Sequence, residues 1–179
     1  KRNTEIIQSR SDDIDSNYID NFPYLEHPEN ISLALKVCQE LGVNKDKALK
    51  GMLKTNPDPG ALLIWNIKNK NYFVSAFAAN DPDSTFKVWK LIKNKFNNKI
   101  CFFLNTRDDR RYRTIQLIDL VFNRINPDLF IVRGNNIKND IDKYDVSTKI
   151  KLFPMDSSYE EIINYIINLN NYTIIGIGN

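Results

Sequence analysis

Cysteine and histidine are scarce in this sequence, and long apolar runs are missing. The 179 residues include two cysteines and one histidine. Cys38 and Cys101 lie in apolar stretches, where we expect buried free thiols and a reducing, cytosolic environment. No apolar run approaches the roughly 18 residues that a membrane helix needs, and the first residues lack the apolar core of a signal peptide. The sequence therefore predicts a soluble, cytoplasmic chain.

Several motifs that hold nucleotides or metals are also missing. No Gly-x-x-x-x-Gly-Lys-Ser/Thr loop occurs, so this chain cannot hold a nucleoside triphosphate in the P-loop manner. His27 stands in a turn without a Cys or His neighbour at ligand spacing, so we predict no zinc site and assign no residue as a metal ligand. No Ser-His or Cys-His pair is placed for nucleophilic catalysis.

The overall composition is that of a folded globular protein. Hydrophobic residues make up 42% of the chain and charged residues 26%, and the length suits one domain, or one domain and part of another. The net charge of +3 is spread along the chain, which gives little support to a dedicated nucleic-acid-binding protein.

The first third of the sequence predicts helices without a complete domain around them. Ile6 and Ile7 make a short strand-like start. The apolar spacing predicts a helix from Asn30 to Gly42, with Pro28 and Glu29 in its first turn, and a second helix over 45–53. Nothing covers these elements, so residues 1–56 are interpreted as the tail of a larger domain. The prolines and glycine of 56–60 mark the boundary, and residues 57–179 form the next domain.

Beyond the boundary, strands and helices alternate. A hairpin around 69–71 comes first, followed by a helix over 82–96. The remaining elements are expected as strands over 100–104, 129–132, 149–153 and 172–175, and as helices over 109–123, 137–142 and 158–169. This alternation predicts an α/β, Rossmann-like domain with a mostly parallel sheet and helices on both faces.

The first unusual loop between a strand and a helix is 78–85. Pro82 stands near the start of the helix, whose exposed N–H groups can receive an anion. Asn80 is suited to hydrogen-bond a base or a phosphate, and Asp81 to hold a magnesium ion through water. Alternatively, Asp81 simply caps the helix and Asp83 complements its dipole.

The second unusual loop carries four arginines within 107–113. Guanidinium groups are planar, permanently charged forks that clamp phosphate, and we single out Arg107, Arg110 and Arg113 for that role. A surface pair between Asp109 and Arg113 is the simpler account of part of the cluster. The sequence ends in Gly176-Ile177-Gly178-Asn179, which resembles the start of a glycine-rich phosphate turn without a helix to complete it.

Three ordered segments resemble one family. They are Gly51-Met52-Leu53-Lys54-Thr55-Asn56-Pro57-Asp58-Pro59-Gly60-Ala61, Phe77-Ala78-Ala79-Asn80-Asp81-Pro82-Asp83-Ser84-Thr85, and Asn105-Thr106-Arg107-Asp108-Asp109-Arg110 through Arg113-Thr114. Their order and spacing are similar to those of the ligase subunit of poly-γ-glutamate synthase, the capsule-forming PgsB or CapB branch of the Mur ligase superfamily. The resemblance covers nearly the whole chain.

The resemblance implies an ATP-dependent ligase that joins glutamates through the γ-carboxyl by way of an acyl phosphate. It assigns 1–56 to the tail of the central ATP-binding domain and 57–179 to a C-terminal domain of the Mur ligase type. ATP and Mg²⁺ are the implied cofactors, held mostly by the central domain, so this chain alone is expected to be inactive. Glutamate, the growing polymer and membrane subunits are the implied partners, which would place the protein at the inner face of the membrane. The sequence leaves a homo-oligomer open and predicts no nucleic-acid partner.

The resemblance also implies roles for individual residues. Arg107, Arg110 and Asp108 would serve catalysis. The nucleotide side would be formed by Asn30, His27, Asn80, Asp81, Ser84 and Arg113. Ala61 and Ala76 stand where Mur enzymes typically carry an arginine and an acidic residue, so ATP contacts are expected to be redistributed.

Two other functions remain open from the sequence. The first is a non-catalytic α/β module that binds a protein or nucleic acid through 107–113, because clustered arginines also suit nucleic acid. The second is another Mur-type ligase that acts on cell-wall peptide or folylpolyglutamate.

Overall fold

The fold was analysed in a computed structural model, which describes residues 6–22, 26–56 and 62–178. The chain divides into two compact units, Lys1–Pro59 and Gly60–Asn179. Of the expected linker at 56–60, residues 57–60 lie outside the described residues, as does Ala61. No helix among the described residues is long and apolar enough to cross a membrane.

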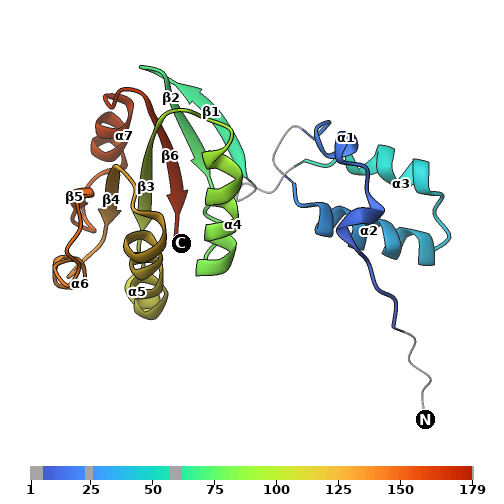
Figure 1. The fold of residues 1–179 in the computed structure, drawn as a ribbon, viewed down its shortest axis with the longest axis horizontal. Helices are drawn as coiled ribbons and strands as arrows, with labels where there is room; N and C mark the ends of the chain where they lie inside the picture. Colours follow the sequence, from blue (N-terminus) through green and yellow to red (C-terminus); the bar gives the residue numbers. More distant parts are fainter. Residues whose placement is uncertain (1–5, 23–25, 57–61, 179) are drawn as a thin grey trace, which may run out of the picture. The chain divides into compact units, whose positions relative to one another are not determined.

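The first unit is built from short helices (Figure 1). They are η1 (Ser11–Asp13), α1 (Ser16–Ile19), α2 (Pro28–Glu40) and α3 (Lys45–Met52). Its core joins Ile14, Ile31, Leu35 and Ala48, and the Tyr18 hydroxyl donates a hydrogen bond to the Leu49 carbonyl at 2.5 Å.

The ends of α2 and α3 have local causes. Gly42 has a φ of +77°, and the N–H groups of Gly42 and Val43 donate to the carbonyls of Gln39 and Cys38, which closes α2 in a Schellman motif. The Asn44 side chain caps α3. Two expectations for this unit were wrong. Ile6 and Ile7 form no strand, and Ile6 is 85% exposed. Cys38, which was expected to be buried, is only half-buried.

The second unit is a six-stranded sheet with helices on both faces (Figure 1). The strand order is β1-β2-β6-β3-β4-β5, and only the β1–β2 pair is antiparallel. The strands are β1 (Leu63–Ile67), β2 (Asn71–Ser75), β3 (Lys99–Asn105), β4 (Leu129–Arg133), β5 (Lys149–Phe153) and β6 (Tyr172–Ile177). The helical segments are α4 (Pro82–Lys93), η2 (Asp108–Arg110), α5 (Arg111–Leu120), η3 (Val121–Ile125), α6 (Lys138–Ile141) and α7 (Tyr159–Ile167).

Alternation along the buried strands supplies both faces of the core. On β3, Cys101 and Phe103 point to one face, where α7 packs through Ile162 and Ile166. The opposite face is covered from the α5 side, because Phe122 meets Phe130 of β4 edge to face at 5.4 Å. Burial raises the pKa of the Cys101 thiol well above its usual value.

The strand order and pairing confirm the predicted mostly parallel α/β sheet.

The chain order explains where a site can form. The strand β6 arrives last and inserts between β2 and β3, so the carboxyl ends of these three parallel strands lie side by side. In open α/β sheets, ligands bind at this edge.

Candidate functional site

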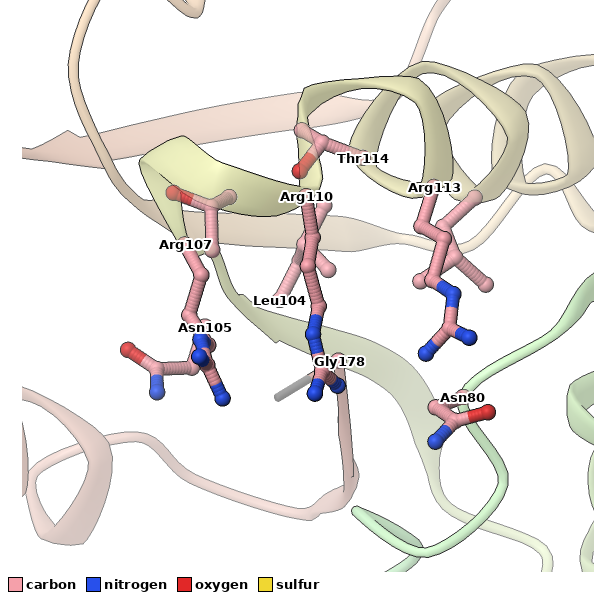
Figure 2. Close-up of a pocket in the computed structure, with 10 residues that line it drawn as sticks. Asn80, Leu104, Asn105, Arg107, Arg110, Arg113, Thr114 and Gly178 are labelled. Carbon is pink, nitrogen blue, oxygen red and sulfur yellow. The ribbon is translucent and has the colours of Figure 1, made fainter.

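A shallow pocket lies at the carboxyl ends of β2, β6 and β3 (Figure 2). Its lining comes from the loop that follows β2, from the end of β3 with η2 and the first turns of α5, and from the residue after β6. The lining residues are Asn80, Leu104, Asn105, Thr106, Arg107, Arg110, Arg113, Thr114, Leu117 and Gly178. Three of these side chains are guanidinium groups, and none is a carboxylate.

The three arginines reach the pocket from one continuous segment. After the buried strand β3, Arg107 is extended and η2 makes one tight turn before α5 begins. Figure 2 shows the side chains of Arg107, Arg110 and Arg113 extending from this segment on the same side, with Arg113 toward Asn80. The first turn of α5 also borders the pocket through Thr114, so the positive end of the helix dipole adds to the arginine charge.

Among the described residues, one of the three arginines is paired with an acid. Arg107 forms an ion pair with Asp109 at 2.8 Å, and this guanidinium lowers the pKa of the Asp109 carboxyl. Within residues 62–178, neither Arg110 nor Arg113 forms an ion pair. The expected pair between Asp109 and Arg113 is therefore wrong. The pocket carries uncompensated positive charge, which suits a phosphate or another compact anion.

The fourth arginine of the cluster points elsewhere. Arg111 forms an ion pair with Asp140, which is 7% exposed, and donates hydrogen bonds to the carbonyls of Asn135 and Asn136. It joins α5 to the segment after β4 and does not line the pocket. Its role is structural.

The floor of the pocket depends on contacts between strand ends. The Thr106 hydroxyl donates to the Arg133 carbonyl at 2.9 Å, which ties the end of β3 to the end of β4. Arg133 in turn donates from Nη1 to Oδ1 of Asn105 at 3.2 Å. Gly178 has a φ of +81°, and a Cβ there would lie 2.5 Å from the Asn105 carbonyl oxygen. Glycine at this position therefore allows β6 to end against β3.

The other predicted site residues lie in different places. Asp81 and Ser84 interact with each other: the Asp81 carboxylate accepts a hydrogen bond from the Ser84 N–H at 3.0 Å and caps α4, which lowers the pKa of Asp81. Asp108 is exposed in η2 and does not line the pocket.

Two more predicted site residues belong to the first unit. His27 is the N-cap of α2, and its N–H donates to Oε1 of Glu26 at 2.7 Å. Asn30 donates from its side chain to the same oxygen at 2.9 Å. Ala76 is one of the two alanines at which the sequence departs from the Mur pattern. It is buried, and its N–H donates to the Gly176 carbonyl at 2.9 Å.

Some lining residues had no role assigned from the sequence. Asn105, Thr106 and Thr114 stand within the quoted arginine motif, and their position at a strand end and helix start was the available signal. Gly178 was noted only as part of a weak glycine-rich turn. Leu104 and Leu117 read as ordinary core positions, and nothing in their pattern indicated a pocket.

Comparison with known families gives a direct match for the second unit. Residues 64–179 match the family described as "Poly-gamma-glutamate synthase CapB C-terminal domain". The chain belongs to the CapB family.

Two curated CapB proteins match the chain over its whole length. It is 32% identical over 188 residues to the capsule biosynthesis protein CapB of Bacillus anthracis, and 34% identical over 189 residues to the PGA synthase CapB of Bacillus subtilis. The alignments cover all of this chain, 40% of the first relative and 48% of the second. The chain thus spans less than half the length of these relatives.

Solved Mur-type ligases share the fold. MurF of Acinetobacter baumannii matches 84% of this chain and 34% of its own chain, with a TM-score of 0.63 and 17% identity. A folylpolyglutamate synthase of Thermotoga maritima matches 83% of this chain and 34% of its own, with a TM-score of 0.56 and 17% identity. MurF of Thermotoga maritima, solved in complex with ADP, has a TM-score of 0.56 at 16% identity, over 84% of this chain and 34% of its own. The predicted C-terminal fold of the Mur ligase type is confirmed.

Proposed function

We propose that this chain is the C-terminal part of an ATP-dependent ligase that builds poly-γ-glutamate, and that its arginine pocket binds the phosphates of the nucleotide. The observation that carries the proposal is a pocket with three guanidinium groups and no carboxylate, at the carboxyl edge of the sheet of a CapB-family chain. In the proposed reaction, ATP phosphorylates a γ-carboxylate of glutamate, and the amino group of the next glutamate attacks the acyl phosphate, releasing ADP and phosphate.

The three arginines and Asn80 each have a task in this scheme. Arg110 and Arg113, which have no acidic partner within residues 62–178, bind non-bridging phosphate oxygens. Arg107 is oriented by Asp109 and lines the same pocket, where its positive charge can stabilise the charge that develops during phosphoryl transfer. Asn80, from the loop after β2, borders the same pocket and is placed to donate to a phosphate oxygen or a ribose.

The donor set of the described pocket residues fits phosphate and does not fit magnesium. No cluster of three His, Cys, Asp or Glu side chains suited to a metal occurs among the described residues, and the pocket lacks a carboxylate. Asp81 has a structural task as the cap of α4. The proposed Mg²⁺ therefore takes its protein ligands from outside the described residues, in the central domain.

The two units receive different assignments in this proposal. Residues 1–56 are the tail of the central ATP-binding domain, and 57–179 are the C-terminal domain that closes over the nucleotide. Asn30 and His27, at the start of α2, are assigned to the adenine side. Because the P-loop belongs to the central domain, the 179-residue chain alone does not catalyse ligation.

The polymer and the membrane are part of the proposal as well. The partners are glutamate, the growing poly-γ-glutamate chain and membrane subunits of the synthase. The protein would work on the cytoplasmic side, at the inner face of the membrane. The names of the two CapB relatives support the capsule and polymer assignment.

An isotope experiment tests this reaction directly. The complete protein that contains this chain is supplied with ATP and with glutamate whose γ-carboxylate carries ¹⁸O. Activation through an acyl phosphate transfers one labelled oxygen into inorganic phosphate for each amide formed. Release of AMP, or of phosphate without label alongside amide product, contradicts the proposal. Glutamate-independent ATP hydrolysis with no amide product also contradicts it.

A further inference from the structure

One segment outside the arginine pocket is basic without any acidic residue. From Ser84 to Lys99 the sequence carries five lysines and no acidic residue. The whole chain has a net charge of +3, so the rest of the chain has a net charge of −2. This segment comprises most of α4 and the turn after it, and none of its lysines lines the arginine pocket. The concentration of charge therefore needs a separate explanation.

Three cations of this region are fixed over two aromatic rings. Phe86 and Trp89 stack with centroids 5.3 Å apart. Nζ of Lys90 lies 4.7 Å from the Phe86 centroid, and the Arg124 guanidinium carbon, which comes from η3, lies 3.9 Å from the same centroid. Nζ of Lys93 lies 4.6 Å from the Trp89 centroid. We call Phe86, Trp89, Lys90, Lys93 and Arg124 the cationic stripe.

The cations of the stripe are not neutralised by acidic side chains within residues 62–178. Lys90, Lys93 and Arg124 are exposed, and none of them forms an ion pair within residues 62–178. Cation–π contacts hold their side chains without removing their charge. Because the rings restrict the rotamers, less conformational entropy is lost when an anion binds. The stripe is therefore a preorganised row of cations.

The stripe has a direction relative to the pocket. Its helix α4 follows the loop that brings Asn80 to the pocket, and its 12 residues extend for about 18 Å. Phe86 lies in the second turn and Lys93 is the last helical residue. The lysines of the stripe therefore lie along the helix that follows this loop.

We propose that the cationic stripe binds the poly-γ-glutamate chain, a flexible polymer with one carboxylate per residue. This inference rests on the proposed function, which supplies the polymer. The geometry favours a polycarboxylate over single-stranded nucleic acid, since stacking of bases needs accessible ring faces. Here Phe86 and Trp89 stack on each other and carry cations, so the groups offered to a partner are ammonium and guanidinium.

Binding of a γ-linked glutamate oligomer of defined length to the 179-residue chain tests the proposal. The variant K90Q/K93Q/R124Q is expected to bind about tenfold more weakly than wild type, with a shallower dependence on salt. K90R/K93R/R124K keeps the charges and is expected to bind within about twofold of wild type. K45Q/K47Q/K50Q on α3 removes the same charge from exposed lysines and serves as the matched control.

Two results overturn the proposal. Equal weakening in the stripe variant and the α3 control means that only net charge matters. Tighter binding of a single-stranded RNA of equal charge, lost in the same stripe variant, assigns the surface to nucleic acid instead.

The complete protein separates this inference from the proposed function. If the proposed function fails, wild type forms no glutamate-dependent amide at all. If only the stripe proposal fails, wild type ligates and K90Q/K93Q/R124Q makes polymer of wild-type length. The proposal predicts that this variant forms the first amide bond at the wild-type rate but makes shorter polymer.

Discussion

Arg107 and Asp109 form a bidentate ion pair at the rim of the pocket, with Nε to Oδ1 at 2.9 Å and Nη2 to Oδ2 at 2.8 Å. Both partners are substantially exposed, so the pair itself contributes little to stability. Its value lies in orientation, because it selects one direction for the guanidinium plane. Arg107 can therefore be explained in two ways, as half of a surface ion pair or as a phosphate ligand, and substitution of each partner distinguishes them.

The two partners should differ when they are replaced one at a time. We expect Arg107→Gln in the complete protein to lower kcat/KM for ATP about tenfold or more, since a charged hydrogen bond is lost. Asp109→Asn keeps the arginine and removes only its orientation, so we expect a change below about threefold. Steady-state kinetics measure both values. Equal effects of the two substitutions would reduce Arg107 to a surface pair.

Asp81 should act as a helix cap. We expect Asp81→Ala to lower the unfolding free energy by about 1 kcal/mol, and Asp81→Asn to change it little, because asparagine caps equally well. The Ser84 N–H lowers the folded pKa of Asp81, so the cap is fully stabilising above the usual aspartate value of 3.8 and is lost as the pH falls through the lower folded pKa. Urea denaturation of the 179-residue chain measures this.

The same two variants separate a cap from a ligand. A cap role leaves the activity of the complete protein with Asp81→Asn near wild type. A large loss of activity in Asp81→Asn at unchanged stability would instead support the metal or nucleotide role.

The pair between Arg111 and Asp140 should be a stability determinant without a role in phosphate binding. Asp140 is buried, so Arg111→Met leaves its carboxylate, among the described residues, with Lys143 at 3.5 Å as its one ion-pair partner. We expect a loss of about 1 to 3 kcal/mol in denaturant unfolding. The double variant Arg111→Met, Asp140→Leu should recover part of the loss, since it removes the unpaired charge. A double variant no more stable than Arg111→Met would contradict this account.

Two glycines with similar backbones should respond differently to alanine. Gly42 has a φ of +77° with nothing near its missing Cβ, so Gly42→Ala costs backbone strain alone, about 1 kcal/mol. At Gly178 the new Cβ would also meet the Asn105 carbonyl and the Leu104 side chain at 2.5 and 2.6 Å. We expect Gly178→Ala to be the more destabilising variant and to weaken phosphate binding. Equal unfolding free energies would argue against the close packing of β6 on β3.

Much of the second unit follows from local pattern. Asn69 and Lys70 both adopt positive φ and lie in the turn of the hairpin that the sequence predicts around 69–71. Buried strands such as β3 read as continuous apolar runs, because both faces of a parallel sheet are covered. The arginine cluster could also be predicted as a site, because it directly follows such a buried strand.

The rest depends on contacts that sequence spacing does not encode. The polar stretch before α2 gave no indication of η1 and α1. These helices form because Ile14 and Tyr18 pack on the later helices. The insertion of β6 between β2 and β3 brings Gly178 to Asn105, and strand order is a tertiary property. For Asp81 the sequence allowed two roles. The hydrogen bond from the Ser84 N–H shows that Asp81 caps α4, and a role toward nucleotide or metal stays a prediction.

The central claim is that Arg110 and Arg113 bind the phosphates, and ATP-dependent ligation by the complete protein with single glutamine substitutions tests it most directly. We expect Arg110→Gln and Arg113→Gln each to lower kcat/KM for ATP about 10- to 100-fold, since a charged hydrogen bond contributes about 1.5 to 3 kcal/mol. Arg10→Gln, at an exposed arginine of the first unit, should remain within about twofold of wild type. Wild-type kinetics in both pocket variants, or an equal loss in Arg10→Gln, would contradict the account.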